Sequence, residues 1–297
     1  MISPAMRARL KQILPRPLWD AARRSQTFMR RLLIWRALMR EIKGATETDR
    51  KTLRKSARRG IIRGLKTLDV WQNPELIADA VLRVPAIGEF EIRAGTDDLY
   101  HVLPSREAAI VGELKEQLRP GSTFVDAGAN IGFFTVLAAQ LVGPTGRVVA
   151  IEMMPDTASR LRAHLAMNHL TNVVVHEHAL SNHSGSEVVA TVPDGEFGRA
   201  TIARTSDGQR KVTVITSTLD EVLDDTTVSV DLIKMDLEGA ETLALERSGK
   251  VLKRTKSVIF EQLEGDDSAS EFLKKAGFHL RMLDGSNWLA QRSARRK

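Results

Sequence analysis

The chain has 297 residues, of which 42% are hydrophobic and 27% are charged, and its formal net charge is +7; this is the composition of a globular protein. The absence of cysteine excludes disulfides, zinc–thiolate sites and cysteine nucleophiles. Arginines interrupt the apolar runs near the N-terminus, so we expect a cytoplasmic protein with neither a signal peptide nor a membrane span of roughly 18 apolar residues.

The charge is divided unevenly along the chain. Residues 1–66 contain 19 Lys and Arg against 4 Asp and Glu, a net charge of +15, whereas the remainder contains 25 against 33, a net charge of −8. We expect a basic helical N-terminal arm over residues 1–80 and an acidic body over residues 81–297. Such an arm suits contact with a membrane surface, a nucleic acid or an acidic partner, and it also suits packing on the acidic body.

Residues 25–44 predict an amphipathic helix within this arm, because five apolar side chains recur at helical spacing: Phe28, Leu32, Trp35, Met39 and Ile42. A basic helix of this kind is able to lie in a membrane interface, although packing within the protein is the commoner role of such a face. Two hypotheses for this helix therefore remain: peripheral attachment of the protein to the inner face of the membrane, and packing of the helix within the protein.

The rest of the chain predicts an α/β fold. Residues 81–95 predict two short strands around a turn, and residues 106–118 predict a helix. Strands and helices then alternate, which indicates a mostly parallel sheet with helices on both faces. The predicted strands are 123–127, 147–151, 173–179, 231–235 and 257–261, and the predicted helices are 132–142, 156–169 (with Asp156 as N-cap) and 239–249. Residues 278–283 and 287–292 flank a turn and predict a closing antiparallel hairpin.

An insert at about residues 187–216 breaks the alternation. Short strands are predicted at 187–192, 200–204 and 211–217, where a helix would be expected. Because ligands bind at the carboxyl edge of open α/β sheets, this β-rich insert is a candidate substrate lid. The alternative is an extension of the sheet edge with no role in binding.

The segment "VDAGANIG" places a glycine loop at that edge. Gly128 directly follows a strand and Gly132 opens a helix, and backbone N–H groups in such loops commonly bind phosphate. Asp126, however, puts a carboxylate before the loop, where it would repel a pyrophosphate and attract a cation or orient a loop around one. A nucleoside that carries an ammonium and a sulfonium group, S-adenosylmethionine, suits this field better than NAD does.

Glu152 indicates a nucleoside cofactor but does not distinguish S-adenosylmethionine from NAD. It ends the next strand, 24 residues after Gly128, a spacing typical of an acid that accepts hydrogen bonds from ribose hydroxyls. Met153, directly after it, and His178 and Ala179, past the third strand, are further candidate cofactor contacts, the last two beside an adenine ring. The alternative for His178, and for the nearby His176, is a purely structural role. No histidine has a partner at a convincing metal-ligand spacing, so no metal site is expected.

Three carboxylates follow the fourth and fifth strands of the sheet: Asp236, Glu238 and Glu261. A hydroxyl group is weakly acidic, so its methylation calls for a general base or for desolvation, and these carboxylates are candidates for that role. The alternative is that Asp236 caps a helix and that Glu238 complements its dipole.

Taken together, "VDAGANIGFFT", "VVAIEMMP", an "N-x-x-x-N-V" run, "LIKMDLEGAE" and "VIFE" resemble the FkbM family of S-adenosylmethionine-dependent methyltransferases over about residues 121–261. The resemblance implies a class I methyltransferase (Rossmann-like) fold and O-methylation, commonly of sugar or natural-product hydroxyls; an arm on a membrane would suit a glycolipid acceptor. It implies cofactor contacts from Asp126, Gly128, Asn130 and Glu152, and a methyl-transfer site lined by Asp236 and Glu238.

Two other functions stay open. A nucleic-acid methyltransferase, acting for instance on ribose, would use the arm on phosphates, but the acidic run after the fourth strand has no aromatic residue for base stacking, so nucleic acid is not an expected partner. The other is a non-catalytic, membrane-docked module with a methyltransferase-like fold. The intact Asp126 and Glu152 argue against that module.

Overall fold

The computed structural model describes residues 15–66, 73–193, 198, 200–203 and 210–293. The chain divides into two compact units: Met1–Pro85 with Glu91–Leu103, and Ala86–Phe90 with Pro104–Lys297. Residues 91–103 thus group with the arm, although the sequence places them in the body. The reason is that Lys43 and Gly44 of the arm pair antiparallel with Arg83 and Leu82 of the predicted hairpin, so arm and hairpin share a sheet.

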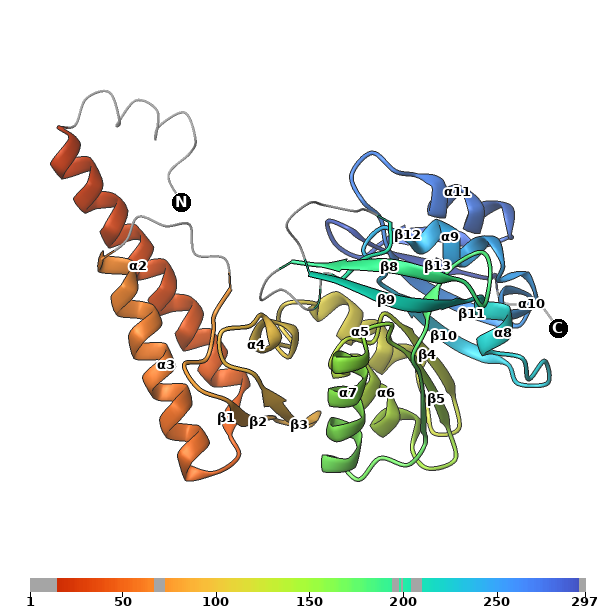
Figure 1. Ribbon diagram of the computed structural model, residues 1–297, viewed down its shortest axis with the longest axis horizontal. Coiled ribbons are helices and arrows are strands. Elements are labelled where there is room, and N and C mark those ends of the chain that lie inside the picture. The colour runs from red at the N-terminus through yellow and green to blue at the C-terminus, as the bar shows by residue number, and fades with distance from the viewer. Residues whose placement is uncertain (1–14, 67–72, 194–197, 199, 204–209, 294–297) are drawn as a thin grey trace. The chain divides into compact units, whose positions relative to one another are not determined.

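The first unit is built on two long helices, α2 (Arg16–Glu41) and α3 (Glu47–Lys66), which lie side by side (Figure 1). A small sheet of order β1-β2-β3 accompanies them. Its strand β1 (Lys43–Gly44) lies between the two helices in the chain, and β2 (Ala80–Val84), β3 (Gly88–Ile92) and the short helix α4 (Asp98–His101) follow them, with residues 88–90 of β3 grouped with the second unit. A helix is confirmed over most of the predicted segment, with Ile42 as its C-cap. Of the predicted apolar face, Trp35 and Ile42 are buried, whereas Met39 is 39% exposed and Leu38 is buried instead. Part of the apolar face therefore packs within the protein.

The second unit contains a seven-stranded sheet of order β12-β13-β11-β10-β4-β5-β6. Its parallel strands are β4 (Thr123–Ala127), β5 (Arg147–Ile151), β6 (Val173–His176), β10 (Val230–Met235) and β11 (Thr255–Glu261). The last two strands, β12 (His279–Met282) and β13 (Asn287–Gln291), form an antiparallel hairpin against β11. The predicted mostly parallel sheet with a closing antiparallel hairpin is therefore confirmed.

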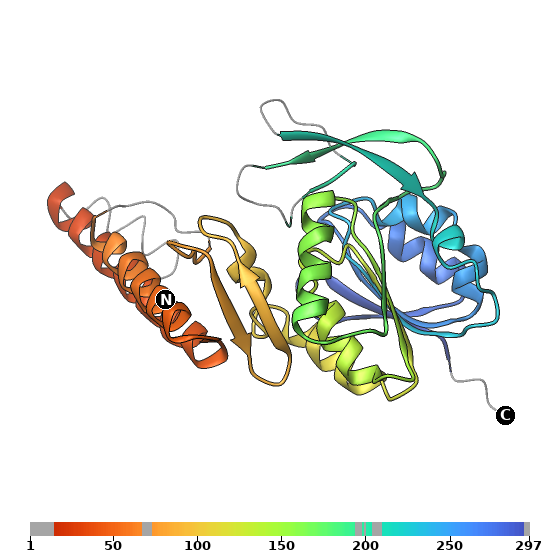
Figure 2. The same cartoon turned by 60° about the horizontal axis from the view of Figure 1, so that its bottom comes forward.

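Helices cover both faces of this sheet (Figure 2). One face carries α6 (Phe133–Val142) and α7 (Pro155–Met167), with α5 (Ala108–Gln117) before them in the chain. The other face packs on α8 (Leu219–Val222), α9 (Glu241–Glu246), α10 (Gly249–Lys253) and α11 (Ser268–Lys275) through one apolar cluster. Every residue of β4 is buried, as expected of a strand that helices cover on both sides.

Three local predictions were wrong. The third strand ends at His176, because Ala179 and Leu180 leave the sheet and pair as β7 with the insert. The helix predicted at 239–249 is two helices, α9 and α10. Asp156 is not an N-cap, because Pro155 starts α7 one residue earlier and Met154 is the cap.

The insert forms a sheet of its own, of order β7-β9-β8, with β7 Ala179–Leu180, β8 Glu187–Val192 and β9 Arg210–Ser217. Two of the three strands predicted there are confirmed. The described residues of the predicted strand 200–204 contribute only an isolated bridge, between Thr201 and Thr191. None of the helices among the described residues is both long and apolar enough to cross a bilayer.

Candidate active site

The glycine loop after β4 adopts a backbone that few residues tolerate. Gly128 has φ +79°, Asn130 +49° and Gly132 +91°. A Cβ atom on Gly128 would lie 1.8 Å from the carbonyl oxygen of Asp236, a distance that no side chain can occupy. The loop therefore packs directly on the backbone that follows β10, and the amides of Gly128 and Ala129 both donate to the carbonyl of Ile151 at 3.0 Å.

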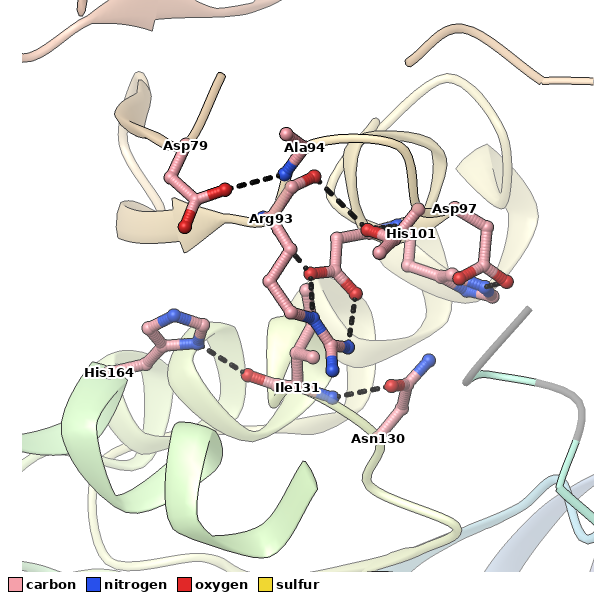
Figure 3. Close-up of polar contacts among 10 residues, drawn as sticks. Asp79, Arg93, Ala94, Asp97, His101, Asn130, Ile131 and His164 are labelled. Atoms are coloured by element: carbon pink, nitrogen blue, oxygen red, sulfur yellow. Dashed lines mark hydrogen bonds and ion pairs between the residues drawn. The ribbon is translucent and has the colours of Figure 1, made fainter. Parts of the chain in front are cut away.

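Asn130 is stabilised in its left-handed conformation by its own side chain. Its Oδ1 atom accepts a hydrogen bond from the amide of Ile131 at 2.8 Å, a local contact that lets Asn adopt positive φ. The Ile131 carbonyl in turn contacts Nδ1 of the fully buried His164 at 2.7 Å (Figure 3). His164 thus ties the loop to α7.

Glu152, at the end of β5, binds the loop from the neighbouring strand. Its two carboxylate oxygens accept hydrogen bonds from the amides of Asn130 at 2.8 Å and Met154 at 2.9 Å. Burial raises the pKa of Glu152 to about 7, although these two amides act in the opposite direction. A carboxylate has about four acceptor positions, so two more lone pairs remain for a ligand with hydroxyl donors.

Asp126 is fully buried. Its Oδ2 atom accepts a hydrogen bond from the Thr135 hydroxyl at 2.6 Å, and its Oδ1 atom lies 3.9 Å from the ammonium of Lys234. Burial raises the pKa of Asp126, while Lys234 and Thr135 oppose that rise. The cation beside this carboxylate is therefore the protein's own Lys234. Lys234 also donates a hydrogen bond to the Gly128 carbonyl in the loop.

Lys234 is the centre of this charge cluster. Its ammonium donates to Asp236 Oδ2 at 3.2 Å and to the carbonyl of Gly128 at 3.4 Å, and it lies 5.1 Å from the centroid of the Phe134 ring. Burial alone would lower the pKa of Lys234, but Asp236, Asp126 and Glu107 raise it above its ordinary value. The ammonium thus stays charged and joins strands β4 and β10.

The sequence reasoning missed Lys234, and a signal for it was present. A lysine in the otherwise apolar strand "DLIKM" is unusual, because charged residues are rarely buried without a partner. It also missed Thr135 and Glu107, whose proximity to Lys234 and Asp126 depends on folding and has no local signature.

The predicted catalytic carboxylates lie at the same edge. Asp236 directly follows β10, and its side chain is 32% exposed; Glu261 ends β11. Burial raises the pKa of Glu261, and the neighbouring charge of Asp236 raises it further. Asp236 and Glu261 directly follow Met235 and Phe260, which pair across β10 and β11, so the two residues occupy neighbouring positions at this edge. Asp236 does not cap α9, whose N-cap residue is Ala240.

Glu238 lies in a strained turn that follows Asp236 in the chain and contacts the insert. It has φ +51°, and its carbonyl accepts a hydrogen bond from the Thr201 hydroxyl at 3.0 Å. Glu241, another residue that the sequence reasoning left without a role, accepts a hydrogen bond from the amide of Leu237 at 2.7 Å. Burial raises the pKa of Glu241 to about 7. The insert and α9 thus hold the turn from two sides.

The remaining predicted contacts lie beside the insert. Ala179 is buried in β7, and Met153 packs on the apolar cluster that joins Met154 and Ala179 to the insert strands. Nδ1 of His178 is buried and makes no hydrogen bond to the described residues. No three His, Asp or Glu side chains in the described part of the chain converge in a way that suits a metal ion.

The chain is similar to known methyltransferases. Residues 126–284, more than half of the chain, match the family model of the methyltransferase FkbM domain. An arsenite methyltransferase of Halobacterium salinarum is 43% identical over 56 residues, which cover 19% of this chain and 14% of that protein. A protein-L-isoaspartate O-methyltransferase of Methanopyrus kandleri is 31% identical over 128 residues, 39% of this chain and 55% of that one.

The chain therefore spans about half the length of the second relative and far less of the first. Among solved structures, that of a methyltransferase FkbM from Methylobacillus flagellatus aligns with a TM-score of 0.40 and 18% identity, over 66% of this chain and 54% of the other.

Proposed function

The chain belongs to the FkbM methyltransferase family, an S-adenosylmethionine-dependent enzyme family, and from this we propose that it methylates a hydroxyl group of a sugar, a glycolipid or a natural product. The observation that carries the proposal is the juxtaposition of Asp236 and Glu261 at the sheet edge where the Gly128 loop lies, because they directly follow Met235 and Phe260, which pair across β10 and β11. Acceptors such as hydroxyls need a nearby group to take their proton.

The residues of this edge fit S-adenosylmethionine. Glu152 keeps acceptor positions for the ribose hydroxyls, and the left-handed backbone of Gly128, with φ +79°, turns the chain from β4 into the loop. We assign the cofactor site to these two residues with Asn130, and Met153, His178 and Ala179 to its apolar wall. Asp126 and Gly132 support the site by shaping the loop. When bound, S-adenosylmethionine supplies the electrophilic methyl group.

The protein's own part in the reaction is to orient the acceptor and to take its proton. A general base works best when its pKa lies near the operating pH, and both burial and the charge of Asp236 move Glu261 in that direction. Asp236 is held by Lys234 at 3.2 Å, so its orientation is fixed. Most of the acceleration would come from positioning the two reactants in line.

The basic arm suggests where in the cell the protein binds its acceptor. Apolar side chains on its two helices are exposed among arginines: Leu18 (58%), Leu33 (59%) and Leu65 (47%). A basic helix with exposed apolar groups suits peripheral binding to an anionic membrane, and we propose that the protein works at the inner face of the membrane. Flotation of the full chain with anionic and with zwitterionic vesicles tests this; equal recovery would contradict it.

A transfer assay with methyl-labelled S-adenosylmethionine tests the substrate class. Free sugars, glycolipids, a small phenol and RNA are offered in parallel, and the product linkage is analysed. We expect label in an alkali-stable methyl ether of a sugar or glycolipid. Label in RNA alone, or in a carboxyl ester, would overturn the proposed acceptor while leaving the cofactor assignment in place.

A further inference from the structure

The turn between β10 and α9 has a backbone that needs support. Asp236 begins this turn directly after β10, and α9 starts at Glu241. Between them, Glu238 has φ +51° and Gly239 has φ +99°. Two consecutive left-handed residues, one of which carries a side chain, persist only where the surrounding structure holds them. The turn also carries Asp236 and Glu238, which the family resemblance places at the methyl-transfer site.

The side chain of Glu241 supplies that support. Glu241 is only 5% exposed, and its Oε1 atom accepts hydrogen bonds from two amides of the turn, that of Leu237 at 2.7 Å and that of Gly239 at 3.5 Å. These are the amides of the residues before and after Glu238. A single buried oxygen therefore holds the backbone on both sides of the left-handed residue.

Two other segments of the second unit contact the same turn. The hydroxyl of Thr201 in the insert donates to the Glu238 carbonyl at 3.0 Å. A Cβ atom on Gly239 would lie 3.1 Å from Cδ1 of Leu263, in the segment after β11, and 3.7 Å from Cβ of Ala203 in the insert. A change in the backbone of the turn would therefore disturb its contacts with the insert and with the segment that follows Glu261.

We propose that Glu241 is a positioning residue for methyl transfer, which holds the turn in the conformation that sets Asp236 and Glu238 at the acceptor. This inference rests on the proposed function, because it assigns these two residues to the acceptor side of the site. Glu241 takes no proton from the acceptor; it acts through the two amides that its Oε1 atom binds. Misplacement of reacting groups by about 1 Å is able to cost about 100-fold in rate.

Three substitutions of Glu241 separate positioning from charge and from packing. Glu241→Gln keeps an acceptor oxygen at the Oε1 position, and Glu241→Met fills a similar space with at most a weak acceptor. Glu241→Asp keeps the charge but withdraws the carboxylate from the amides by one methylene group. Glu113→Met is the matched control, because Glu113 is also a buried glutamate, 8% exposed, but lies on α5 and pairs with Arg281.

Steady-state methyl transfer from S-adenosylmethionine is measured for the full chain and for each variant. The acceptor is the member of the transfer-assay panel that the wild type labels fastest. Titration with S-adenosylhomocysteine gives the concentration of binding-competent sites, so that kcat is expressed per folded site and a loss of folded protein is not counted as a loss of turnover.

We expect Glu241→Met to lower kcat per site by about tenfold or more, with less than a twofold change in the affinity for S-adenosylhomocysteine. Glu241→Gln should recover most of kcat, and Glu113→Met should leave kcat per site unchanged. Glu241→Asp should be slower than Glu241→Gln, because reach and not charge is what the amides require. This order decides the matter even if Glu241→Met does not fold.

Two results would overturn the inference and leave the proposed function in place. The first is a kcat in Glu241→Asp equal to or above that in Glu241→Gln. The second is a loss of affinity for S-adenosylhomocysteine in Glu241→Met as large as its loss of kcat. A wild type that binds S-adenosylhomocysteine but labels no acceptor of the panel would instead overturn the proposed function, and this inference with it.

Discussion

At the scale of single residues, the site depends on buried charges that compensate one another. Lys234 lies among Asp126, Asp236 and Glu107, so one ammonium offsets several carboxylates beneath the glycine loop. Breaking a buried pair leaves an uncompensated charge and commonly costs about 3–5 kcal/mol. The cluster therefore links the stability of the fold to the geometry of the cofactor loop.

Glu152 gives the protein a pH dependence with opposite signs for stability and binding. Its folded pKa of about 7 lies above its ordinary value of 4.5, so its protonation stabilises the fold below that ordinary value, and this stabilisation is lost as the pH rises through about 7. Binding of the ribose, in contrast, needs the ionised carboxylate of Glu152, which accepts hydrogen bonds from the ribose hydroxyls.

We therefore expect the ligand-free protein to unfold at a lower temperature at pH 8 than at pH 6, while its affinity for S-adenosylhomocysteine rises by about tenfold over that interval. Glu152→Gln should flatten the affinity curve and remove part of the stability change, because the raised pKa of Glu241, also about 7, still contributes to stability. An affinity in the wild type that falls over that interval would contradict the assignment of Glu152.

Glu238→Gln should lower turnover more than cofactor affinity. The substitution removes a charge at the turn after β10 but keeps the shape of the side chain, and the family resemblance implies that Glu238 lines the methyl-transfer site. Steady-state kinetics and equilibrium binding of S-adenosylhomocysteine separate the two effects. If affinity fell more than turnover, Glu238 would belong to the cofactor site instead.

Some site residues have a local signal in the sequence, whereas others are brought to the site only by folding. Gly128 and Glu152 follow from strand ends and their spacing, because both features are local. The contact between Thr201 and Glu238 joins residues 37 positions apart, and the role of Lys234 depends on β4 and β10, which only the folded sheet brings together. No periodicity in the sequence carries that information.

At the scale of elements, the loop between β4 and α6 depends on a glycine that packs on β10. In Gly128→Ala the new Cβ meets the Asp236 carbonyl at 1.8 Å, and left-handed strain adds to the clash, so we expect a loss of about 3 kcal/mol or more in unfolding free energy. Gly265→Ala is the control, because Gly265 has φ +82° but open space around it.

The control should lose about 1–2 kcal/mol, the cost of the left-handed backbone alone. Chemical denaturation of both variants measures the difference. Equal losses would mean that the contact between the loop and β10 contributes nothing to stability.

The insert is predicted to act on the acceptor rather than on the cofactor. Thr201→Val removes the hydroxyl that donates to the Glu238 carbonyl, a contact worth about 1 kcal/mol. We expect kcat/KM for the acceptor to fall severalfold with unchanged affinity for S-adenosylhomocysteine. Thr213→Val, on the exposed face of β9, should change neither. A loss of cofactor affinity in Thr201→Val would contradict a substrate lid.

The strands of the sheet were predicted more accurately than the helices that cover it. Residues 123–127 and 147–151 are apolar runs bounded by turn residues, and β4 and β5 have these same bounds. The break between α9 and α10 falls at Arg247 and Ser248, the C-cap of the first helix and the N-cap of the second, and both helices contribute to the same apolar cluster. Helical periodicity alone does not reveal such a break.

At the scale of the whole molecule, the chain combines a family domain with a unit that the family model does not cover. The match begins at residue 126, whereas the two basic helices end at Lys66. The sequence indicated a basic helical arm through charge and periodicity. It did not indicate the pairing of β1 with β2, because a two-residue strand has no detectable pattern.

All residues of the proposed cofactor site belong to the second unit, so its ligand should stabilise that unit directly. The most direct test is thermal unfolding of the full chain with S-adenosylhomocysteine, with NAD and with neither. A ligand at about 100 times its Kd stabilises by about 2.7 kcal/mol, or several degrees for a domain of this size. Glu152→Ala and, as a control, Glu116→Ala on the exposed surface of α5 are measured beside the wild type.

We expect a shift of several degrees with S-adenosylhomocysteine alone. It should be retained in Glu116→Ala and lost in Glu152→Ala, relative to the ligand-free unfolding temperature of each variant. No shift in the wild type, or the same shift in Glu152→Ala as in the wild type, would contradict the cofactor site described for this sheet edge.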